Sequence, residues 1–201
     1  MKKFNLLIVG IGGEGVLTSG VVVARAAHEE DMYVTGLQLH GLSQRGGSIP
    51  VFVRFGSEVH APTFGMGDAD LIIATEPSEA LRFAKYGNLE KTMFIIDDSV
   101  VKSPYSNVEN EHYPSKEEIM RYLKPFSKKI YYIPISEECK KKFGDKIYGN
   151  IALLGVAVSL GALPLKEESM IKAIKETARR NLDKNMDAFK YGLEYGRKLN
   201  V

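Results

Sequence analysis

The sequence contains one cysteine, Cys139, and no tryptophan among its 201 residues. A single cysteine excludes an internal disulfide, and it cannot supply the four thiolates that hold an iron–sulfur cluster. Neither a second cysteine nor a recognisable nucleophile motif accompanies Cys139 in "SEECKKKFG". We therefore interpret Cys139 as a bystander rather than as a reactive thiol.

The sequence also lacks an excess of charge of one sign and a long apolar run. Its formal net charge is +2, which is too small to indicate a nucleic acid or an anionic membrane as a partner. No segment approaches the roughly 20 apolar residues that span a bilayer, and the apolar run after Lys3 is too short for a signal peptide. We therefore expect a cytoplasmic location, with no nucleic-acid partner and no membrane partner.

Apolar residues make up 44% of the chain and charged residues 26%, as in an ordinary globular domain. Strand-like and helix-like runs alternate, beginning with a strand over 3–9, a helix over 14–29 and a strand over 33–39. Alternating runs on either side of Gly56-Ser57 predict an antiparallel hairpin. The pattern predicts one domain over residues 1–201, with a three-layer α/β/α Rossmann-like fold, a mostly parallel but mixed sheet and a helical C-terminus.

The stretch "LLIVGIGGEGVLTSG" places a glycine-rich turn between the first strand and the first helix. Gly10, Gly12 and Gly15 satisfy G-x-G-x-x-G, and Gly13 lies in the same turn. Free backbone N–H groups at such a helix start can bind an anion, but glycines there also serve for close packing alone. NAD binding further needs an acid at the end of the second strand. That strand ends in "GLQLHG", so the sequence disfavours NAD(P).

The same turn also occurs in the adenylate-forming family that activates ubiquitin-like proteins. That family likewise uses an aspartate after its second strand, and usually a distinctive cysteine. Neither feature is convincing in this sequence.

A second glycine segment, "HGLSQRGGS" (residues 40–48), is the most distinctive part of the chain. Arg45 places a planar cation directly before Gly46 and Gly47, where other groups can approach the backbone closely. His40 and Gln44 add a titratable ring and an amide to the same loop. Loops at this end of a strand border the ligand crevice in open α/β sheets. A purely structural loop, with Arg45 in an ion pair, is the alternative interpretation.

Three stretches in this order, "GIGGEGVLTSGVVVARAA", "HGLSQRGGS" and "VRFGSEVHAPTFGMGDADLIIATEPSEALR", carry a family resemblance. Across essentially its whole length the chain resembles the gamma subunit or domain of 2-oxoacid:ferredoxin oxidoreductases. Pyruvate- and 2-oxoglutarate-type relatives tend to have a Tyr-Gly-x-x-x-Arg-Gly-Gly loop. The His-Gly-Leu-Ser-Gln-Arg-Gly-Gly loop of this chain is similar to the arylpyruvate type, as in the beta subunit of indolepyruvate ferredoxin oxidoreductase.

The resemblance implies an oxidative decarboxylation in which this chain is one subunit. Thiamine diphosphate attacks an aryl 2-oxo acid, carbon dioxide leaves, coenzyme A collects the acyl group, and electrons pass through iron–sulfur clusters to ferredoxin. The chain lacks the Gly-Asp-Gly start of a thiamine diphosphate and magnesium motif, and "GMGDAD" comes nearest. A larger partner subunit is therefore expected to carry thiamine diphosphate, magnesium and the clusters, and this chain is not expected to be active alone.

The expected site residues support catalysis rather than perform it. Because they share one loop, we hypothesise that His40, Gln44 and Arg45 face the larger subunit near the entrance for substrate or coenzyme A. Arg45 would neutralise a carboxylate or a phosphate there. The other predicted ligand or interface residues are seven from the two glycine segments and one acid after a later strand: Gly10, Gly12, Gly13, Gly15, Gly46, Gly47, Ser48 and Glu76.

Asp97 and Asp98 follow the strand-like "MFII" and could bind a metal. Two adjacent acids without further ligands are more typical of helix capping or solvated residues, so we predict no metal site.

Three alternative functions stay open at this point. The chain could serve an oxidoreductase for another 2-oxo acid, such as pyruvate, 2-oxoisovalerate or 2-oxoglutarate. It could be a stand-alone nucleotide-binding protein, or an interaction module that uses the glycine turn only for packing.

Overall fold

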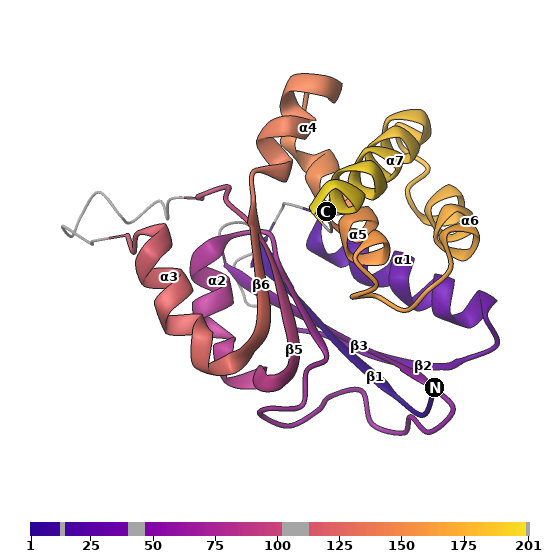
Figure 1. Ribbon diagram of the computed structural model, residues 1–201. Helices are drawn as coiled ribbons and strands as arrows, with labels where there is room; N and C mark the ends of the chain where they lie inside the picture. The colour runs from indigo at the N-terminus through magenta and orange to yellow at the C-terminus, as the bar shows by residue number, and fades with distance from the viewer. Residues whose placement is uncertain (13–14, 40–46, 102–112, 200–201) are drawn as a thin grey trace.

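A computed structural model describes residues 1–12, 15–39, 47–101 and 113–199 of the chain. In these residues a six-stranded sheet lies between two layers of helices (Figure 1). The strands are β1 (Phe4–Ile11), β2 (Tyr33–Gln38), β3 (Ser48–Gly56), β4 (Leu71–Ala74), β5 (Asn88–Asp97) and β6 (Ser127–Ile133). The α-helices are α1 (Val16–Glu29), α2 (Pro77–Arg82), α3 (Lys116–Leu123), α4 (Ile135–Phe143), α5 (Gly149–Ser159), α6 (Glu167–Thr177) and α7 (Leu182–Leu199). Three short 3-10 helices are η1 (Ala84–Tyr86), η2 (Lys124–Phe126) and η3 (Lys146–Tyr148). The predicted three-layer α/β fold is confirmed.

The sheet is mixed, as predicted, and its strand order is β2-β3-β1-β4-β5-β6. The pairs β1–β4, β4–β5 and β5–β6 are parallel, whereas β3 is antiparallel to both β1 and β2. Among the described strands β3 alone runs against the others, and it lies between β2 and β1. One half of the sheet is therefore parallel and the other antiparallel.

The predicted hairpin at Gly56-Ser57 is wrong, because β3 ends at Gly56 and residues 57–70 form no strand. The backbone at Gly56 has a φ of 142° and lies so close to Lys2 that a Cβ would be 2.5 Å from its carbonyl oxygen. Beyond it, Ser57 N and Glu58 N donate hydrogen bonds to the carbonyls of Met1 and Lys2. The chain after Gly56 thus pairs with the N-terminal residues instead of folding back on β3.

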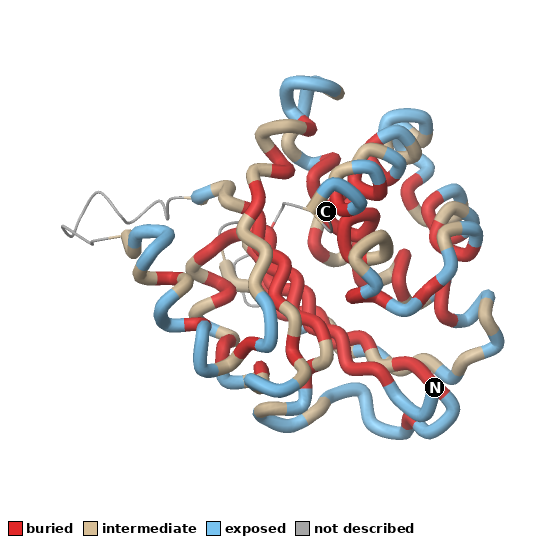
Figure 2. Tube along the Cα trace, in the orientation of Figure 1, coloured by how far each residue is buried: buried red, intermediate tan, exposed pale blue. Residues whose placement is uncertain are grey.

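Side-chain alternation along the strands gives each sheet face its own core. Buried residues, red in Figure 2, follow the central strands and parts of the helices on both sides of the sheet. On one face, Leu6 and Ile8 of β1 pack with buried residues of α1, α5, α6 and α7. On the other face, Leu7 and Val9 pack with residues of α2 and α3. The segment "NIALLGVAVSLGAL" is apolar all round, which predicts a buried helix. Helix α5 is buried over residues 149–157, which confirms this prediction. No helix in the described ranges has the length and apolarity needed to cross a membrane.

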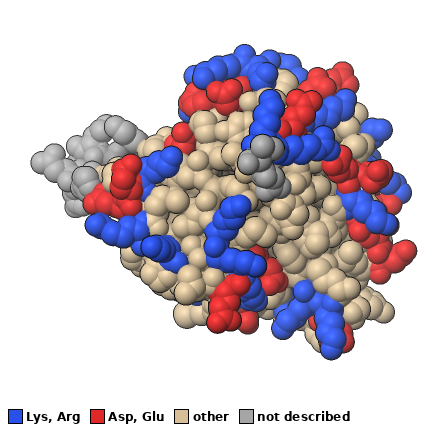
Figure 3. Space-filling view, viewed as in Figure 1, with Lys and Arg blue, Asp and Glu red and all other residues tan. Residues whose placement is uncertain are grey.

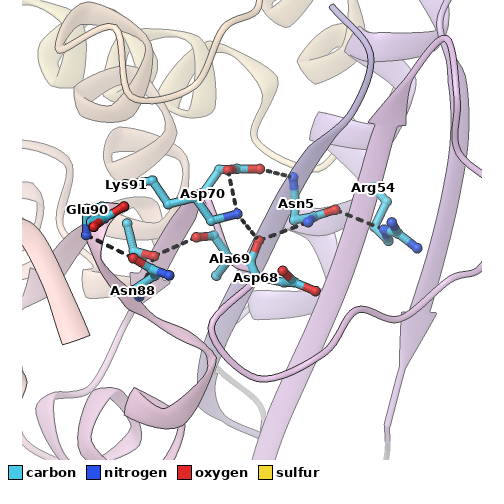
Figure 4. A network of polar contacts seen from close by, with 9 residues as sticks. Asn5, Arg54, Asp68, Ala69, Asp70, Asn88, Glu90 and Lys91 are labelled. Atoms are coloured by element: carbon cyan, nitrogen blue, oxygen red, sulfur yellow. Dashed lines mark hydrogen bonds and ion pairs between the residues drawn. The ribbon is translucent and has the colours of Figure 1, made fainter.

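A polar network closes the edge of the sheet at which β1 begins (Figure 4). Asn5 is 1% exposed, its Nδ2 donates to the carbonyl of Asp68, and its Oδ1 accepts from Arg54 Nε at 2.9 Å. The backbone N–H of Asn5 donates to Asp70, whose carboxylate also pairs with Lys91 at 3.1 Å. These contacts fix the 57–70 connection against β1, β3 and β5.

Charged side chains of both signs are interspersed on the face of the molecule seen in Figure 3. They surround a broad uncharged area, and no large patch of one sign is visible on this face. This distribution is consistent with the small net charge of the sequence.

Candidate functional site

The described residues of the predicted site lie at the edge of the sheet where the parallel strands β1 and β4 end. These strands are neighbours, yet the helices that follow them pack on opposite faces, α1 with the larger core and α2 with the smaller one. In open α/β sheets, ligands bind beyond the strand ends at such a reversal. The glycine turn follows β1 directly, so it lies at this point.

Two glycines of the turn have clear local reasons. A Cβ on Gly10 would lie 2.0 Å from Thr75 Oγ1 and 2.7 Å from Val16 Cγ2, so only glycine fits between β4 and the start of α1. Gly15 precedes α1 with a φ of 83°, in the left-handed region that side chains rarely adopt. In the described residues no side chain caps α1, and its first turn contains no acid. A helix start of this kind can hold an anionic group.

The structure joins the two glycine segments. The Gly12 N–H donates to the Gly47 carbonyl at 2.8 Å, and the hydroxyl of Ser48 donates to the Glu79 carboxylate. Glu79 is 3% exposed and also pairs with Arg82 Nε at 3.1 Å. The start of β3 is thereby tied to both the glycine turn and α2. Other predicted site residues lie outside the described ranges: Gly13, His40, Gln44, Arg45 and Gly46.

Glu76 lies at the same edge but is fully buried. As the N-cap of α2 it accepts hydrogen bonds from Glu79 N at 3.1 Å and from Ser78 Oγ at 2.5 Å. Tyr113 OH donates to its second oxygen, and burial together with the Glu76 carboxylate raises the pKa of Tyr113. Both oxygens are thus occupied by donors of this chain. This geometry favours a capping role for Glu76 at the start of α2.

Asp97 ends β5 and is also fully buried. Its Oδ1 accepts the Ser136 N–H at 3.1 Å, so Asp97 supports the start of α4. Its Oδ2 is buried with no hydrogen-bond partner in the described part of the chain. Burial raises the pKa of Asp97 to about 6, against the lowering effect of Ser136. Among the described residues no group of three His, Cys, Asp or Glu side chains could hold a metal ion.

A cleft of about 430 Å³ lies on the other side of the α1 N-terminus. It is lined by Gly15 and Thr18 of α1, by residues at η3 and the start of α5, and by the turn between α6 and α7. That turn contributes Arg179 and Arg180, two cations that are not among the site residues predicted from the sequence. Arg179 Nε donates to the Glu176 carbonyl, which fixes one side of the turn. No sequence signal connects these arginines with a glycine turn more than 150 residues earlier in the chain.

Cys139 is fully buried within the larger core. Burial, together with the nearby carboxylates of Asp97 and Glu138, raises the pKa of its thiol to about 12. A thiol in this environment is protonated at neutral pH and out of reach of substrates. The structure therefore supports its interpretation as a bystander.

Comparison with known proteins identifies the class to which this fold and site belong. The profile of the pyruvate ferredoxin/flavodoxin oxidoreductase family matches residues 5–195. The chain belongs to this family.

The chain is similar to the indolepyruvate oxidoreductase subunit IorB of Archaeoglobus fulgidus, with 35% identity over 94% of each chain. It is 34% identical to the subunit of the same name from Methanothermobacter thermautotrophicus, over 94% of this chain and 96% of the relative.

Two solved structures show the same fold. The gamma subunit of a keto/oxoacid ferredoxin oxidoreductase from Geobacter sulfurreducens has a TM-score of 0.68 and 21% identity, covering 98% of this chain and 99% of that one. A 2-oxoglutarate:ferredoxin oxidoreductase from Magnetococcus marinus has a TM-score of 0.75 and 18% identity. There the match covers 98% of this chain but 32% of the longer one, so the fold also occurs within a larger polypeptide.

Proposed function

We propose that this chain is the smaller subunit of a cytoplasmic indolepyruvate (arylpyruvate):ferredoxin oxidoreductase. The observation that carries the proposal is the order of similarity over nearly the full chain. Identity is 34–35% to two indolepyruvate oxidoreductase subunits. It falls to 25% for a 2-oxoglutarate synthase subunit and to 27% for a common subunit of pyruvate and ketoisovalerate oxidoreductases.

The larger subunit would hold the redox and decarboxylating groups. The only cysteine of this chain is buried, and one thiolate cannot hold a cluster. Thiamine diphosphate with magnesium, on the larger subunit, would supply the carbanion chemistry, and iron–sulfur clusters would carry single electrons to ferredoxin. For each 2-oxo acid, one carbon dioxide, one acyl-coenzyme A and two reduced ferredoxins would form.

This chain would contribute a surface rather than a reacting group. The Gly12–Gly47 hydrogen bond, which ties the glycine turn before α1 to the start of β3, supports a joint face made of the two glycine segments. We place Arg45, with His40 and Gln44, on this face, opposite the larger subunit. A guanidinium there would offset the negative charge of an entering carboxylate or phosphate.

The substrate assignment is tested by the specificity of the purified two-subunit complex. We expect kcat/KM for indolepyruvate and phenylpyruvate to exceed that for pyruvate and 2-oxoglutarate by about 100-fold or more, since an aryl pocket separates these substrates by several kcal/mol. A complex that prefers pyruvate or 2-oxoglutarate would assign the chain to another 2-oxo acid instead.

The role of Arg45 is tested with Arg45→Ala in the same complex. Loss of a charge-assisted hydrogen bond should raise KM for the 2-oxo acid or for coenzyme A by about 10- to 100-fold. Arg121→Ala, on the exposed side of α3, is the matched control and should leave both values unchanged. If Arg45→Ala assembles and turns over like the wild type, Arg45 does not face the substrates.

A further inference from the structure

The two edges of the sheet differ in how they are protected. An open edge strand can pair with another chain, and proteins usually prevent this with charges, prolines or bulges. At one edge, β6 carries the exposed Lys128 and Lys129. At the other edge, β2 has the sequence YVTGLQ, without a charge or a proline, and it pairs with β3 over six consecutive residues without a bulge. None of the six residues of β2 is buried.

The register identifies which backbone groups of β2 are free. Leu39 N donates to the Pro50 carbonyl of β3 at 3.2 Å. Backbone groups alternate in direction along an antiparallel strand, so Leu37 and Thr35 also face β3. Val34, Gly36 and Gln38 therefore point their N–H and C=O groups away from the sheet, and in the described part of the chain β2 has β3 as its only neighbour.

Apolar surface accompanies these free backbone groups. Tyr33 is 71% exposed and Leu39 is 48% exposed, one at each end of the strand and on the same face. On the opposite face a groove of about 410 Å³ runs between α1 and the strand. Small and branched residues line much of it: Gly20, Ala24, Gly36, Val51 and Val53.

We propose that β2 pairs antiparallel with β2 of a second copy of this chain, with Gly36 on the two-fold axis. In this register Gly36 faces its own counterpart and Val34 faces Gln38, so all outward backbone groups of both strands are used. Tyr33 then lies opposite Leu39 of the other copy, which covers the two most exposed apolar side chains of this edge. The sheets of the two copies become continuous.

A second copy fits this edge better than an unrelated segment for two reasons. The outward groups are arranged symmetrically about Gly36, as a two-fold interface requires. The strand has no charge, so no like charges oppose each other when it pairs with itself. The pairing involves neither the glycine turn nor the larger subunit, and it is therefore independent of the proposed reaction.

Amide hydrogen exchange on the purified chain at low and high concentration tests the proposal. We expect a monomer–dimer equilibrium in sedimentation, with exchange at Val34, Gly36 and Gln38 at least about tenfold slower in the dimer. Thr35 and Leu37 bond to β3 in both states, so their amides should be equally protected at both concentrations.

The double variant Tyr33→Lys/Leu39→Lys places lysines opposite each other and should weaken the dimer about tenfold or more. Met66→Lys, at a residue that is 70% exposed elsewhere, is the matched control and should not change association. A chain that stays monomeric, or a dimer that both variants leave unchanged, would overturn the proposal. So would protection of the three amides in a complex that contains one copy of each subunit, because the larger subunit would then cover the edge.

Discussion

At the scale of single residues, the buried carboxylate of Asp97 makes the stability of the fold depend on pH. Its pKa is about 6 in the folded chain, because the side chain is buried, whereas an unfolded aspartate titrates near about 3.9. At pH values between these two pKa values, Asp97 is protonated more often in the native state than in the unfolded state. The free energy of unfolding therefore falls as pH rises from about 4 to 6, by about 2–3 kcal/mol from this group.

Asp97→Asn should remove this pH dependence. The amide oxygen can still accept the Ser136 N–H, while the charge that burial penalises is gone. We expect the variant to gain stability relative to the wild type between pH 4 and 7 in urea unfolding measurements. Asp183→Asn, exposed in the first turn of α7, controls for the change in net charge and should follow the wild-type curve. If the free energies of unfolding of Asp97→Asn and the wild type changed in parallel with pH, the raised pKa of Asp97 would be contradicted.

Gly10 tests whether the glycine turn is needed for packing. A Cβ at this position would overlap Thr75 Oγ1 and Val16, so Gly10→Ala should lower the free energy of unfolding by about 1–3 kcal/mol. Gly65→Ala meets nothing nearer than 3.3 Å and is the matched control. Thr75→Ala removes one of the two clashing groups and should restore part of the loss. An unchanged midpoint of unfolding for Gly10→Ala would mean that β1 and β4 are farther apart than described.

At the scale of elements, the Asn5 network holds the long connection between β3 and β4. Asn5→Ala leaves Arg54 Nε and the Asp68 carbonyl without their buried partner, which should cost about 2–3 kcal/mol of unfolding free energy. The cost should be less than additive with Arg54→Met, since both changes break the same contact. Chemical denaturation of the two single variants and the double variant measures this coupling. Strict additivity would show that the two side chains act separately.

Periodicity identified most elements of the fold but not the path of the chain after β3. The alternating and fully apolar runs predicted the strands, and the all-apolar segment after Asn150 predicted the buried α5. The hairpin after Gly56 failed because its partner is the N-terminal segment, which lies more than 50 residues away in sequence. Local turn preferences do not report hydrogen bonds to a segment that is so distant in sequence.

The site was predictable only where a local sequence pattern marks its residues. The two glycine segments stood out in the sequence, and the structure adds that Gly12 bonds to Gly47. The sequence marked Glu76 only as a ligand or interface residue, and the structure adds that it is the buried N-cap of α2. The buried Asp97 and the arginines of the α6–α7 turn depend on tertiary packing, which no local pattern reports.

At the scale of the whole molecule, the chain offers two separate surfaces. The carboxyl edge around the two glycine segments is the proposed face for the larger subunit and its substrates. The open side of β2 is the proposed contact between copies. Because they involve different residues, variants at one surface should leave the other intact, and their effects on assembly should add.

The central claim is that this chain completes an arylpyruvate:ferredoxin oxidoreductase. Its most direct test is ferredoxin reduction by the purified larger subunit, supplied with indolepyruvate and coenzyme A, before and after this chain is added. We predict negligible turnover without the chain and sustained turnover, with formation of the aryl acyl-coenzyme A, at equimolar subunits. Full activity of the larger subunit alone, or none with the pair on any aryl 2-oxo acid, would contradict the account.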